Sequence, residues 1–361
     1  MLGALSIIFA FGIIIFIHEL GHFVSALLMK IKVEKFAFGF GPELVGVTYK
    51  DTRYAICAIP LGGMVKLAGE YEAETKGNDD EFYQKPWYKR IFVVINGPLM
   101  NYALAIVFFF LSIYIWGLGV PSELPIVGEI RPGYPAEKAG IKSGDVVLEI
   151  NGKKIKMWQD IAQYIHANAD KEIKIKIKRA NEISDIKITP QLEKDMKIGV
   201  VGIMPEIRTQ KAGFFKSAGI SIAHTIDINI IFFAYMWNKI VKWEKPEVAG
   251  PIGIAQIVVQ TSKSGFSSLL ILIGRISVMV GIMNLLPIPI FDGGYILLFL
   301  IEGLITHKKV DSKIIEKMNM VGLSFIIILM IYAFYSDFDR LGVITFVHDK
   351  LNLFFHHLGF K

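Results

Sequence analysis

Four long apolar runs constrain this 361-residue chain more than any other feature of its sequence. They extend over Met1–Val24, Ile91–Val120, Leu269–Ile290 and Val321–Tyr335. Each is close to the roughly 20 residues that an α-helix needs to cross the hydrocarbon core of a membrane. Mixed-charge sequence separates the runs, 53% of all residues are hydrophobic, and the mean hydropathy is +0.48. We therefore predict a polytopic α-helical membrane protein with about four transmembrane helices.

Basic residues beside these runs predict how the helices are oriented. Three of them precede the second run: Lys85, Lys89 and Arg90. A larger group lies between the third and fourth runs: His307, Lys308, Lys309, Lys313 and Lys317. Lysine and arginine are enriched in the cytoplasmic loops of membrane proteins. We therefore expect residues 25–90 and 306–317 in the cytoplasm, and residues 121–265 and both termini outside it.

Charge and cysteine content exclude several other kinds of protein. The net charge is +6, and the basic residues follow the apolar runs instead of forming one patch, so no nucleic-acid partner is expected. Cys57 is the only cysteine, which excludes an intrachain disulfide. The first run lacks a basic leader and a clear cleavage site, so we interpret it as a retained helix and not a signal peptide.

The segment Val33–Lys66, between the first two runs, is rich in glycine and β-forming residues. Alternation in Val45–Tyr49 and Tyr54–Ile59 predicts a hairpin, with glycines at points of turning or close approach: Gly39, Gly41, Gly62 and Gly63. Between two membrane helices, such a β-element must be shielded by protein or lie at the interface. We predict a membrane-associated β-hairpin or sheet, followed by an acidic loop over Glu70–Glu81.

The segment from Pro125 to about Pro205 has the pattern of a compact α+β domain, with short alternating strands and an amphipathic helix at Trp158–Ala169. After it, Phe214–Trp243 is only moderately apolar, which favours an interfacial amphipathic helix over a fifth span. The predicted organisation has five parts: 1–120, first half of the membrane core; 121–205, extracytoplasmic domain; 206–265, interfacial helix and linker; 266–340, second half of the core; 341–361, amphipathic tail.

The residues that carry chemistry begin with His18-Glu19-Leu20-Gly21-His22 in the first apolar run. The i, i+4 spacing puts His18 and His22 on one helix face, where both imidazoles can bind one zinc ion. Glu19 is then placed to take a proton from zinc-bound water. Each charged residue in a membrane helix costs about 2.5–3.5 kcal/mol on insertion scales, so the cluster needs an explanation. A polar interhelical patch or a helix cap is the structural alternative.

Asp292 supplies the carboxylate that such a site lacks. It follows the third apolar run, in the sequence NLLPIPIFDGG. Two histidines and one carboxylate are a common zinc ligand set that leaves one position open for water. The first and third runs are both predicted to enter the membrane from outside, which puts Asp292 at the depth of His18 and His22. The alternative is a turn-forming Asp-Gly-Gly at a helix end.

At these residues the chain resembles the site-2 protease family of intramembrane zinc metalloproteases. HELGH and the N-x-x-P-x-P-x-[LF]-D-G-G pattern are the two signatures of that family, and Phe291 stands where leucine is usual. NGPLMN at 96–101, GFGP at 39–42 and SDFDRL at 336–341 look similar too. The resemblance covers nearly the whole chain and is closest to the bacterial regulator-of-sigma-factor branch. It implies a bacterial cytoplasmic (inner) membrane location, with the active site near the cytoplasmic side.

The resemblance also implies roles for individual residues. His18, His22 and Asp292 would bind one Zn²⁺ per chain, and Glu19 would be the general base. Asn284 would hold the substrate backbone or stabilise the oxyanion, although an interhelical hydrogen bond would also explain it. Weaker candidates, for which structural roles are at least as plausible, include two asparagines, Asn96 and Asn101. The β-element would offer an edge strand to an unwound substrate, since a helical peptide bond is sterically shielded.

The inserted segment resembles a PDZ domain, most clearly in AGIKSGDVVLEINGKKI at 139–155. One copy is visible, where some relatives carry two. The sequence PIVGEI takes the place of the carboxylate-binding loop and predicts these groove residues: Ile126, Val127, Gly128, Glu129 and Ile130. Such grooves bind extended peptide C-termini by strand addition. A spacer that merely excludes bulky substrate domains is an equal alternative.

The predicted function is zinc-dependent proteolysis of single-span membrane proteins, such as anti-sigma factors, or of remnant signal peptides, after a prior extracytoplasmic cut. The expected partners are transmembrane substrates, the lipid bilayer and extracytoplasmic peptide C-termini. One alternative is a catalytically silent membrane scaffold that presents a PDZ domain. A transporter is another, but no repeated halves are visible in the sequence.

Overall fold

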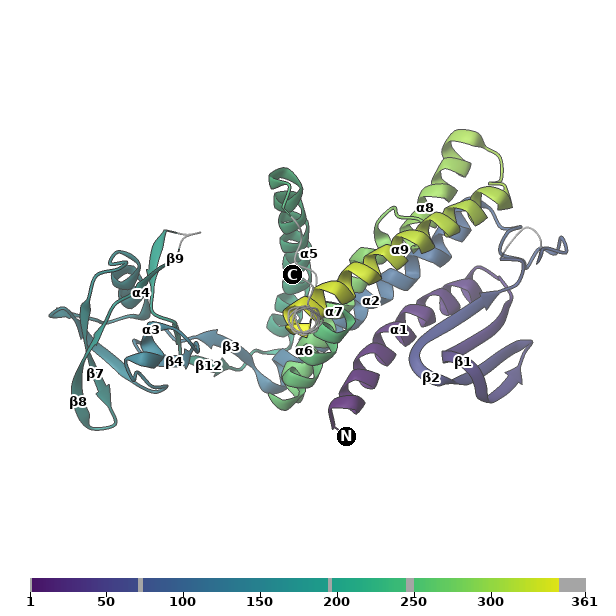
Figure 1. Ribbon diagram of the computed structural model, residues 1–361. Helices are drawn as coiled ribbons and strands as arrows, with labels where there is room; N and C mark the ends of the chain where they lie inside the picture. Colours follow the sequence, from purple (N-terminus) through teal and green to yellow (C-terminus); the bar gives the residue numbers. More distant parts are fainter. Residues whose placement is uncertain (1, 71–73, 194–196, 245–249, 344–361) are drawn as a thin grey trace, which may run out of the picture. The chain divides into compact units, whose positions relative to one another are not determined.

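Figure 1 shows the computed structural model of the chain, which describes these residues: 2–70, 74–193, 197–244 and 250–343. The chain forms two compact units. One comprises residues 1–112 and 214–361, and the other comprises residues 113–213. The predicted inserted domain, 121–205, lies within the second unit. The predicted tail, 341–361, lies outside the described residues from position 344 onward.

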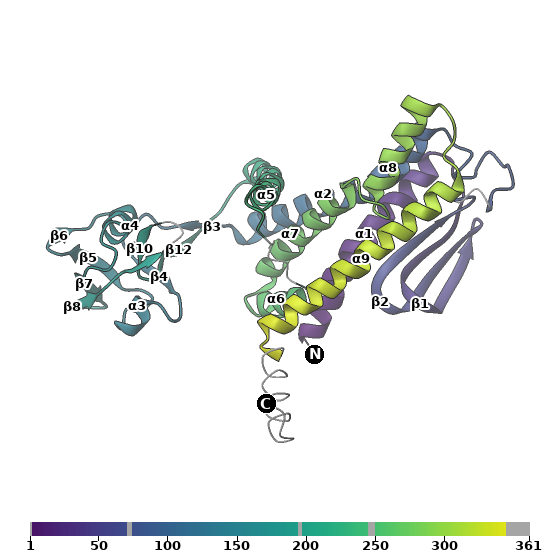
Figure 2. The same cartoon turned by 45° about the horizontal axis from the view of Figure 1, so that its top comes forward.

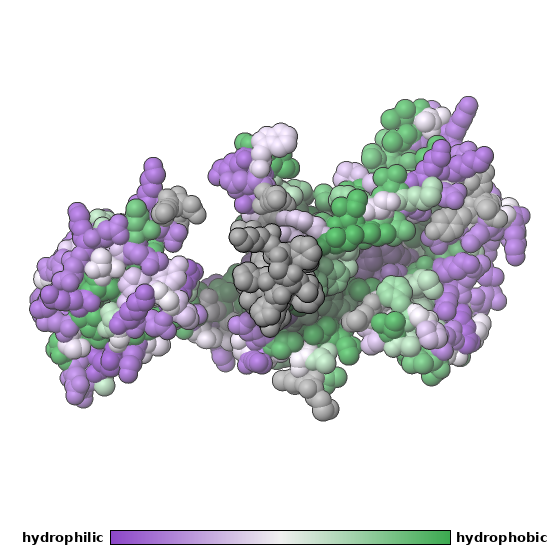
Figure 3. All heavy atoms as spheres, viewed as in Figure 1, coloured by the Kyte–Doolittle hydropathy of each residue, from purple (hydrophilic) through white to green (hydrophobic). Residues whose placement is uncertain are grey.

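Long apolar helices make up most of the first unit. Five described helices are long and apolar enough to cross a membrane. They are α1 (Leu2–Leu28), α2 (Trp87–Trp116), α5 (Phe214–Lys242), α7 (Phe266–Leu285) and α9 (Ser312–Arg340). Hydrophobic residues gather over these helices in Figure 3, whereas hydrophilic residues dominate the surface of the 113–213 unit. The helices therefore present lipid-compatible surface, as a membrane protein requires.

Helix α5 is one candidate span more than the sequence predicts. Its most apolar stretch has a mean hydropathy of 1.4, against 2.0–2.1 for the other four helices. It runs across α2 and α7, not along them (Figures 1 and 2). Tyr102 of α2 donates a hydrogen bond of 2.7 Å to Asn229 of α5. Only its length and composition identify α5 as a candidate membrane span. Its predicted position at the membrane interface therefore stays a prediction.

The other long helices have definite relative directions. At one end, Ser112 of α2 hydrogen-bonds Ser267 of α7 at 2.6 Å, and Val259 of α6 (Pro251–Lys263) lies against Gly3 of α1. At the other end, Ala26 of α1 shares a buried cluster with Phe299 of α8 (Asp292–Ile301). Helices α1 and α7 therefore run the same way, and α2 runs against them.

Asp337, in the SDFDRL motif of α9, caps α6. Its buried carboxylate accepts hydrogen bonds from three backbone N–H groups at the start of that helix: Gly250 (3.2 Å), Ile252 (2.9 Å) and Gly253 (3.1 Å). The first N–H groups of a helix have no intrahelical partner, and a negative charge there is favoured. The motif thus joins the end of α9 to α6.

The β-element consists of β1 (Val33–Tyr49) and β2 (Thr52–Leu67). The predicted hairpin is confirmed, because Val45 pairs with Ile56 and Tyr49 with Thr52. Both strands also double back at bulges, so that Phe36 pairs with Val65 as well as with Tyr54. The resulting order of segments is 43–49, 52–57, 33–38 and 63–67. This leaves 43–49 and 63–67 as the two edges, and β2 packs beside α1 (Figure 2).

A buried ion pair fastens the first turn of α2 to the end of α8. The guanidinium of Arg90 pairs with the carboxylate of Glu302, the first residue of a π-helical turn, η2 (Glu302–Thr306). Arg90 also donates to the Lys85 carbonyl (3.1 Å), and Glu302 accepts from the Val310 N–H (3.2 Å). These extra hydrogen bonds satisfy charges that would otherwise be costly to bury. The pair holds α8, which begins with Asp292, against α2.

The 113–213 unit has its own core. A four-stranded sheet of order β6-β5-β7-β8 packs against α4, with buried residues such as Val127, Ile150, Ile161 and Ile175 between them. The helices and strands of the 113–213 unit are β3 (Leu118–Pro121), β4 (Val127–Ile130), α3 (Pro135–Lys138), β5 (Val146–Ile150), β6 (Lys153–Lys154), α4 (Trp158–His166), β7 (Ile173–Arg179), β8 (Glu182–Ile188), β9 (Gln191–Glu193), β10 (Ile198–Val200), β11 (Ile203–Pro205) and β12 (Ile207–Gln210).

We predict that Asp337→Ala lowers the free energy of unfolding by about 2–3 kcal/mol, because it leaves buried N–H groups without an acceptor. Thermal unfolding of the purified protein in detergent measures the change. Asp339→Ala is the matched control, since Asp339 is exposed on the same helix. Equal unfolding temperatures for the two variants would contradict the assigned role of Asp337.

Candidate metal centre

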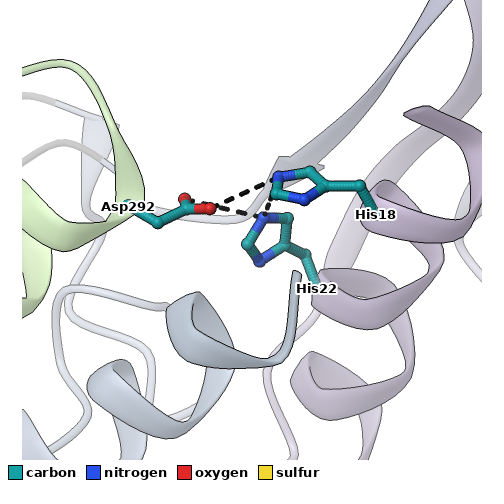
Figure 4. Close-up of side chains that lie close together, drawn as sticks. All are labelled: His18, His22 and Asp292. Atoms are coloured by element: carbon teal, nitrogen blue, oxygen red, sulfur yellow. Dashed lines mark hydrogen bonds and ion pairs between the residues drawn. The ribbon is translucent and has the colours of Figure 1, made fainter. Parts of the chain in front are cut away.

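Helix α1 and the start of α8 bring the three predicted ligands together (Figure 4). Within one turn of α1, the Nε2 atoms of His18 and His22 lie 3.2 Å apart. Asp292 Oδ2 is 3.3 Å from His18 Nε2, and Asp292 Oδ1 is 3.6 Å from His22 Nε2. Among the described residues, these three form the one group of His, Cys, Asp and Glu side chains that could hold a metal ion.

The dimensions of this group fit a zinc ion. Zinc bonds of about 2.0–2.2 Å in a tetrahedral arrangement place neighbouring ligand atoms about 3.3–3.6 Å apart. The distances among the three side chains, 3.2, 3.3 and 3.6 Å, agree with that spacing. Asp292 Oδ2 is buried without a hydrogen-bond partner in the described part of the chain. A bound cation would satisfy this oxygen.

The far nitrogen of each imidazole has a partner on α2. His22 Nδ1 lies 3.0 Å from the Val93 carbonyl, which accepts its N–H and leaves Nε2 free for a metal. His18 Nδ1 lies 3.2 Å from the amide of Asn101, which is fully buried. The amide nitrogen Nδ2 faces His18 in the structure, and Asn101 Oδ1 is buried without a hydrogen-bond partner among the described residues. Turning the amide over would let Oδ1 accept the Nδ1–H and orient the ring in the same way. Asn101 therefore contacts a ligand directly.

Close packing of α1 on α2 depends on two glycines. A Cβ at Gly97 would lie 2.3 Å from His22 Nε2 and 2.9 Å from His18 Cε1. A Cβ at Gly21 would lie 2.3 Å from the Asn96 carbonyl oxygen. The Asn96 side chain itself bonds within α2, to the Phe92 carbonyl. Gly97 was missed as a site residue, although a glycine inside an apolar helix with a recognisable motif is the signal that marks it.

Glu19 lies where the end of β2 meets α1. A Cβ at Gly63 would lie 2.8 Å from Glu19 Cγ, and the backbone N–H of Val65 donates to the Glu19 carboxylate. Of the four glycine candidates in the β-element, Gly63 therefore reaches the site. Gly39 packs against Ile59 instead, as does Gly41, while Gly62 packs against the ring of Phe40.

Asn284 stands apart from these contacts. It lies in the last turn of α7, half-buried, and its side chain makes no hydrogen bond to another residue of the described chain. A free amide near the chain that leads to Asp292 is compatible with a substrate contact. Its predicted role stays a prediction.

A cavity of about 140 Å³ opens from the metal group toward the loop before α2. Glu19, His22 and Asp292 line one part of it, and Glu70 and Arg90 line another. Glu70 lies outside the membrane helices, and burial raises its pKa to about 7. The cavity therefore offers water a route between the candidate active site and the loop before α2.

In the 113–213 unit, the predicted groove residues do not lie together. Val127 is 1% exposed and belongs to the core. Gly128, Glu129 and Ile130 border a hollow beside residues 204–207. A separate groove of about 320 Å³ runs between α4 and residues 200–204. Residues from the end of this unit, and not PIVGEI, line the groove beside α4, and which of the two hollows binds a peptide stays a prediction.

Comparison with known proteins agrees with this geometry. The model of peptidase family M50 matches residues 6–329. A protein of Clostridium acetobutylicum that carries the name of a zinc metalloprotease is 38% identical over 332 residues, covering 91% of this chain and 95% of that protein. The regulator of sigma-W protease of Bacillus subtilis is 27% identical over 420 residues, covering 93% of this chain and 98% of that protein.

Two of the similar solved structures are PDZ domains that cover about a quarter of this chain. The PDZ domain of an SdrC-like protein from Listeria monocytogenes is 23% identical, covers 24% of this chain and 90% of that chain, and has a TM-score of 0.21. The corresponding domain from Listeria innocua is 26% identical, covers 24% and 93%, and has a TM-score of 0.20.

Two imidazoles, a carboxylate and an adjacent glutamate, held between apolar helices, define a membrane metalloprotease. The chain belongs to peptidase family M50, the site-2 protease family. The predicted family and enzyme class are thereby confirmed.

We predict that Gly97→Ala weakens zinc binding about 10- to 100-fold, because the new methyl group displaces the ring of His22. Metal analysis after dialysis against graded chelator measures the affinity. Gly219→Ala is the control, since a Cβ at Gly219 meets no atom within 4 Å. Equal zinc retention in the two variants would refute the proposed packing requirement.

Proposed function

We propose that this chain is a zinc-dependent endopeptidase that cuts the transmembrane segments of single-span proteins, with one zinc ion per chain. The observation that carries the proposal is the ligand group of His18, His22 and Asp292, with Glu19 beside it on the same helix. Anti-sigma factors or remnant signal peptides, trimmed beforehand outside the membrane, are the proposed substrates. The name of the Bacillus subtilis relative, a regulator of sigma-W protease, favours the former.

The proposed reaction divides the chemistry between the metal and the chain. A zinc ion held by His18, His22 and Asp292 would polarise the scissile carbonyl and lower the pKa of its water toward about 7. Glu19 takes one proton from the attacking water and delivers it to the leaving nitrogen. Asn101 and the Val93 carbonyl keep the two imidazoles oriented. The cavity that Glu19 and Glu70 share admits the water.

The edge segment 63–67 of β2 is the proposed docking site for substrate. A transmembrane helix must unwind locally before its peptide bonds can be attacked, and an extended segment can pair with a free strand edge. This edge lies against Glu19 through Gly63 and Val65. A substrate paired here would therefore pass beside the general base.

Four spans with α5 at the interface remain the proposed topology, with both termini and residues 113–213 outside the cytoplasm. Residues 243–250 connect α5 to α6. Fully extended, they reach about 30 Å, no more than the thickness of the hydrocarbon core. If α5 crossed the membrane, residues 243–250 would have to cross it again, fully extended, to reach α6, which lies against the N-terminal end of α1. The oblique course of α5 also suits an interfacial helix.

The groove beside α4 is the proposed peptide site of the inserted domain. Its walls are the helix residues Trp158, Ile161 and Ile165 and the strand residues 200–204. An extended peptide C-terminus could add to that strand. A spacer role, in which the domain only excludes bulky substrates, predicts that substitutions in this groove leave substrate selection unchanged.

A catalytically silent scaffold remains the alternative function. That class predicts a damaged ligand set, whereas His18, Glu19, His22 and Asp292 are all present and three of them converge. The scaffold therefore lacks an observation in its favour.

We predict that Glu19→Gln retains zinc but lowers the turnover of a model single-span substrate by about 10²–10⁴-fold, because the proton acceptor is lost. Metal analysis and a cleavage assay in detergent test both parts. His18→Ala is the comparison, since it should lose zinc as well as turnover. Undiminished proteolysis in Glu19→Gln would remove Glu19 from the mechanism.

We predict that Val65→Pro in the Glu19→Gln background reduces the substrate that co-purifies by about fivefold, because the proline ring obstructs the 63–67 edge and the lost N–H releases the side chain of residue 19 from that edge. Val65→Ala keeps that N–H and serves as one control. Val47→Pro, on the opposite edge of the sheet, serves as the other. Equal substrate capture by all three variants would contradict docking at the 63–67 edge.

A further inference from the structure

A second carboxyl group, Glu70, shares the active-site cavity with Glu19 and Asp292. It follows the end of β2, on the cytoplasmic side in the proposed topology, and is half-buried. Neither the metal group nor the general base accounts for it. A carboxyl that lies in a cavity and is shielded from water usually has a chemical role.

The position of Glu70 is built into the fold. Just before it, the Ala68 carbonyl accepts from the Phe82 N–H (2.8 Å), and the Gly69 carbonyl accepts from the Tyr83 N–H (3.0 Å). Gly69 has a φ of +57° and packs against Glu81, so this turn is closely defined. The backbone N–H of Leu67 donates to the Glu70 carboxylate. The side chain is thereby held at the cavity wall.

Charges around Glu70 leave it able to exist in both protonation states. Burial is the main cause that raises its pKa to about 7, and the charges of Glu74 and Glu19 raise it further, against the Leu67 N–H and Lys66. Other titratable or charged groups also line the cavity: His22, Tyr83, Arg90, Asp292 and Tyr295. Near neutral pH the group can both accept and release a proton, as a carrier must.

Peptide hydrolysis gives such a carrier a task. The attacking water brings two protons, and Glu19 delivers one to the leaving nitrogen. The second remains on the new carboxyl group, which is ionised at neutral pH, so this proton must leave the site for bulk water or for the product amine. A site among apolar helices has few routes for it. The cavity past Glu70 is one such route.

We propose that Glu70 carries protons between the water at the metal centre and the cytoplasm, an inference that rests on the proposed proteolytic function. In each turnover its carboxylate accepts the second proton of the attacking water and releases it to the cytoplasmic side. The residue returns to its starting state, so the overall hydrolysis is unchanged. Glu70 does not touch the reacting atoms. Its role would be to transfer protons between the active-site water and the solvent.

Glu70→Gln tests this role, because it keeps the shape of the side chain and removes its titration. We expect kcat near pH 7 to fall about tenfold, with KM and zinc content unchanged. The wild-type kcat should decline as pH falls below about 7, where Glu70 stays protonated, and the variant should lack that limb of the profile. Kinetics on a model single-span substrate in detergent, with metal analysis, measure all three quantities.

Three comparisons keep the test decisive. Asp79→Asn, at an exposed position in the same loop, should behave as wild type. Glu70→Asp should restore part of the turnover, and a small diffusible carrier such as imidazole should rescue Glu70→Gln. Wild-type kcat and pH profile in Glu70→Gln would overturn the proposal, as would a loss of zinc or a defect that no buffer restores. An inactive wild-type protein would instead refute the proposed proteolysis itself.

Discussion

Contact between the backbone of α2 and the imidazoles of α1 determines the geometry of the metal group. Where Gly97 meets His18 and His22, no side chain has room, so the two helices approach as closely as their backbones permit. That approach also brings the Val93 carbonyl and the Asn101 amide to the far nitrogen of each ring. With those nitrogens occupied, both Nε2 atoms face Asp292. The ligand geometry is therefore a consequence of helix packing.

Several polar groups among the apolar helices are paired or line the cavity. Arg90 and Glu302 neutralise each other at one end of the helices, and Asp337 caps α6 at the opposite end. Both arrangements fasten helices that flank the metal group without contacting it. Charges that are not paired in this way would be costly in so apolar an environment. Stability and catalysis thus depend on different polar groups of the same membrane core.

Local sequence patterns predicted where the strands lie better than they predicted which strands pair with each other. The hairpin between Val45 and Ile59 followed from alternation, but the second pairing of Phe36, with Val65, depends on bulges that no local pattern marks. In the inserted unit, PIVGEI was assigned to the groove because of its position in the domain. Val127 is instead a core residue, since β4 pairs with β11 from the far end of the unit. Both features depend on long-range strand pairing.

The chemistry of this protein was determined by its sequence, because helical periodicity alone puts His18 and His22 on one face and membrane burial makes a polar cluster conspicuous. Asp292 was predictable from its motif and its depth. Tertiary structure alone decided that Gly97 and Asn101 belong to the site, that β2 borders Glu19, and that Glu70 opens onto the same cavity. These are distances between segments far apart in the chain, and packing determines them, not local propensity.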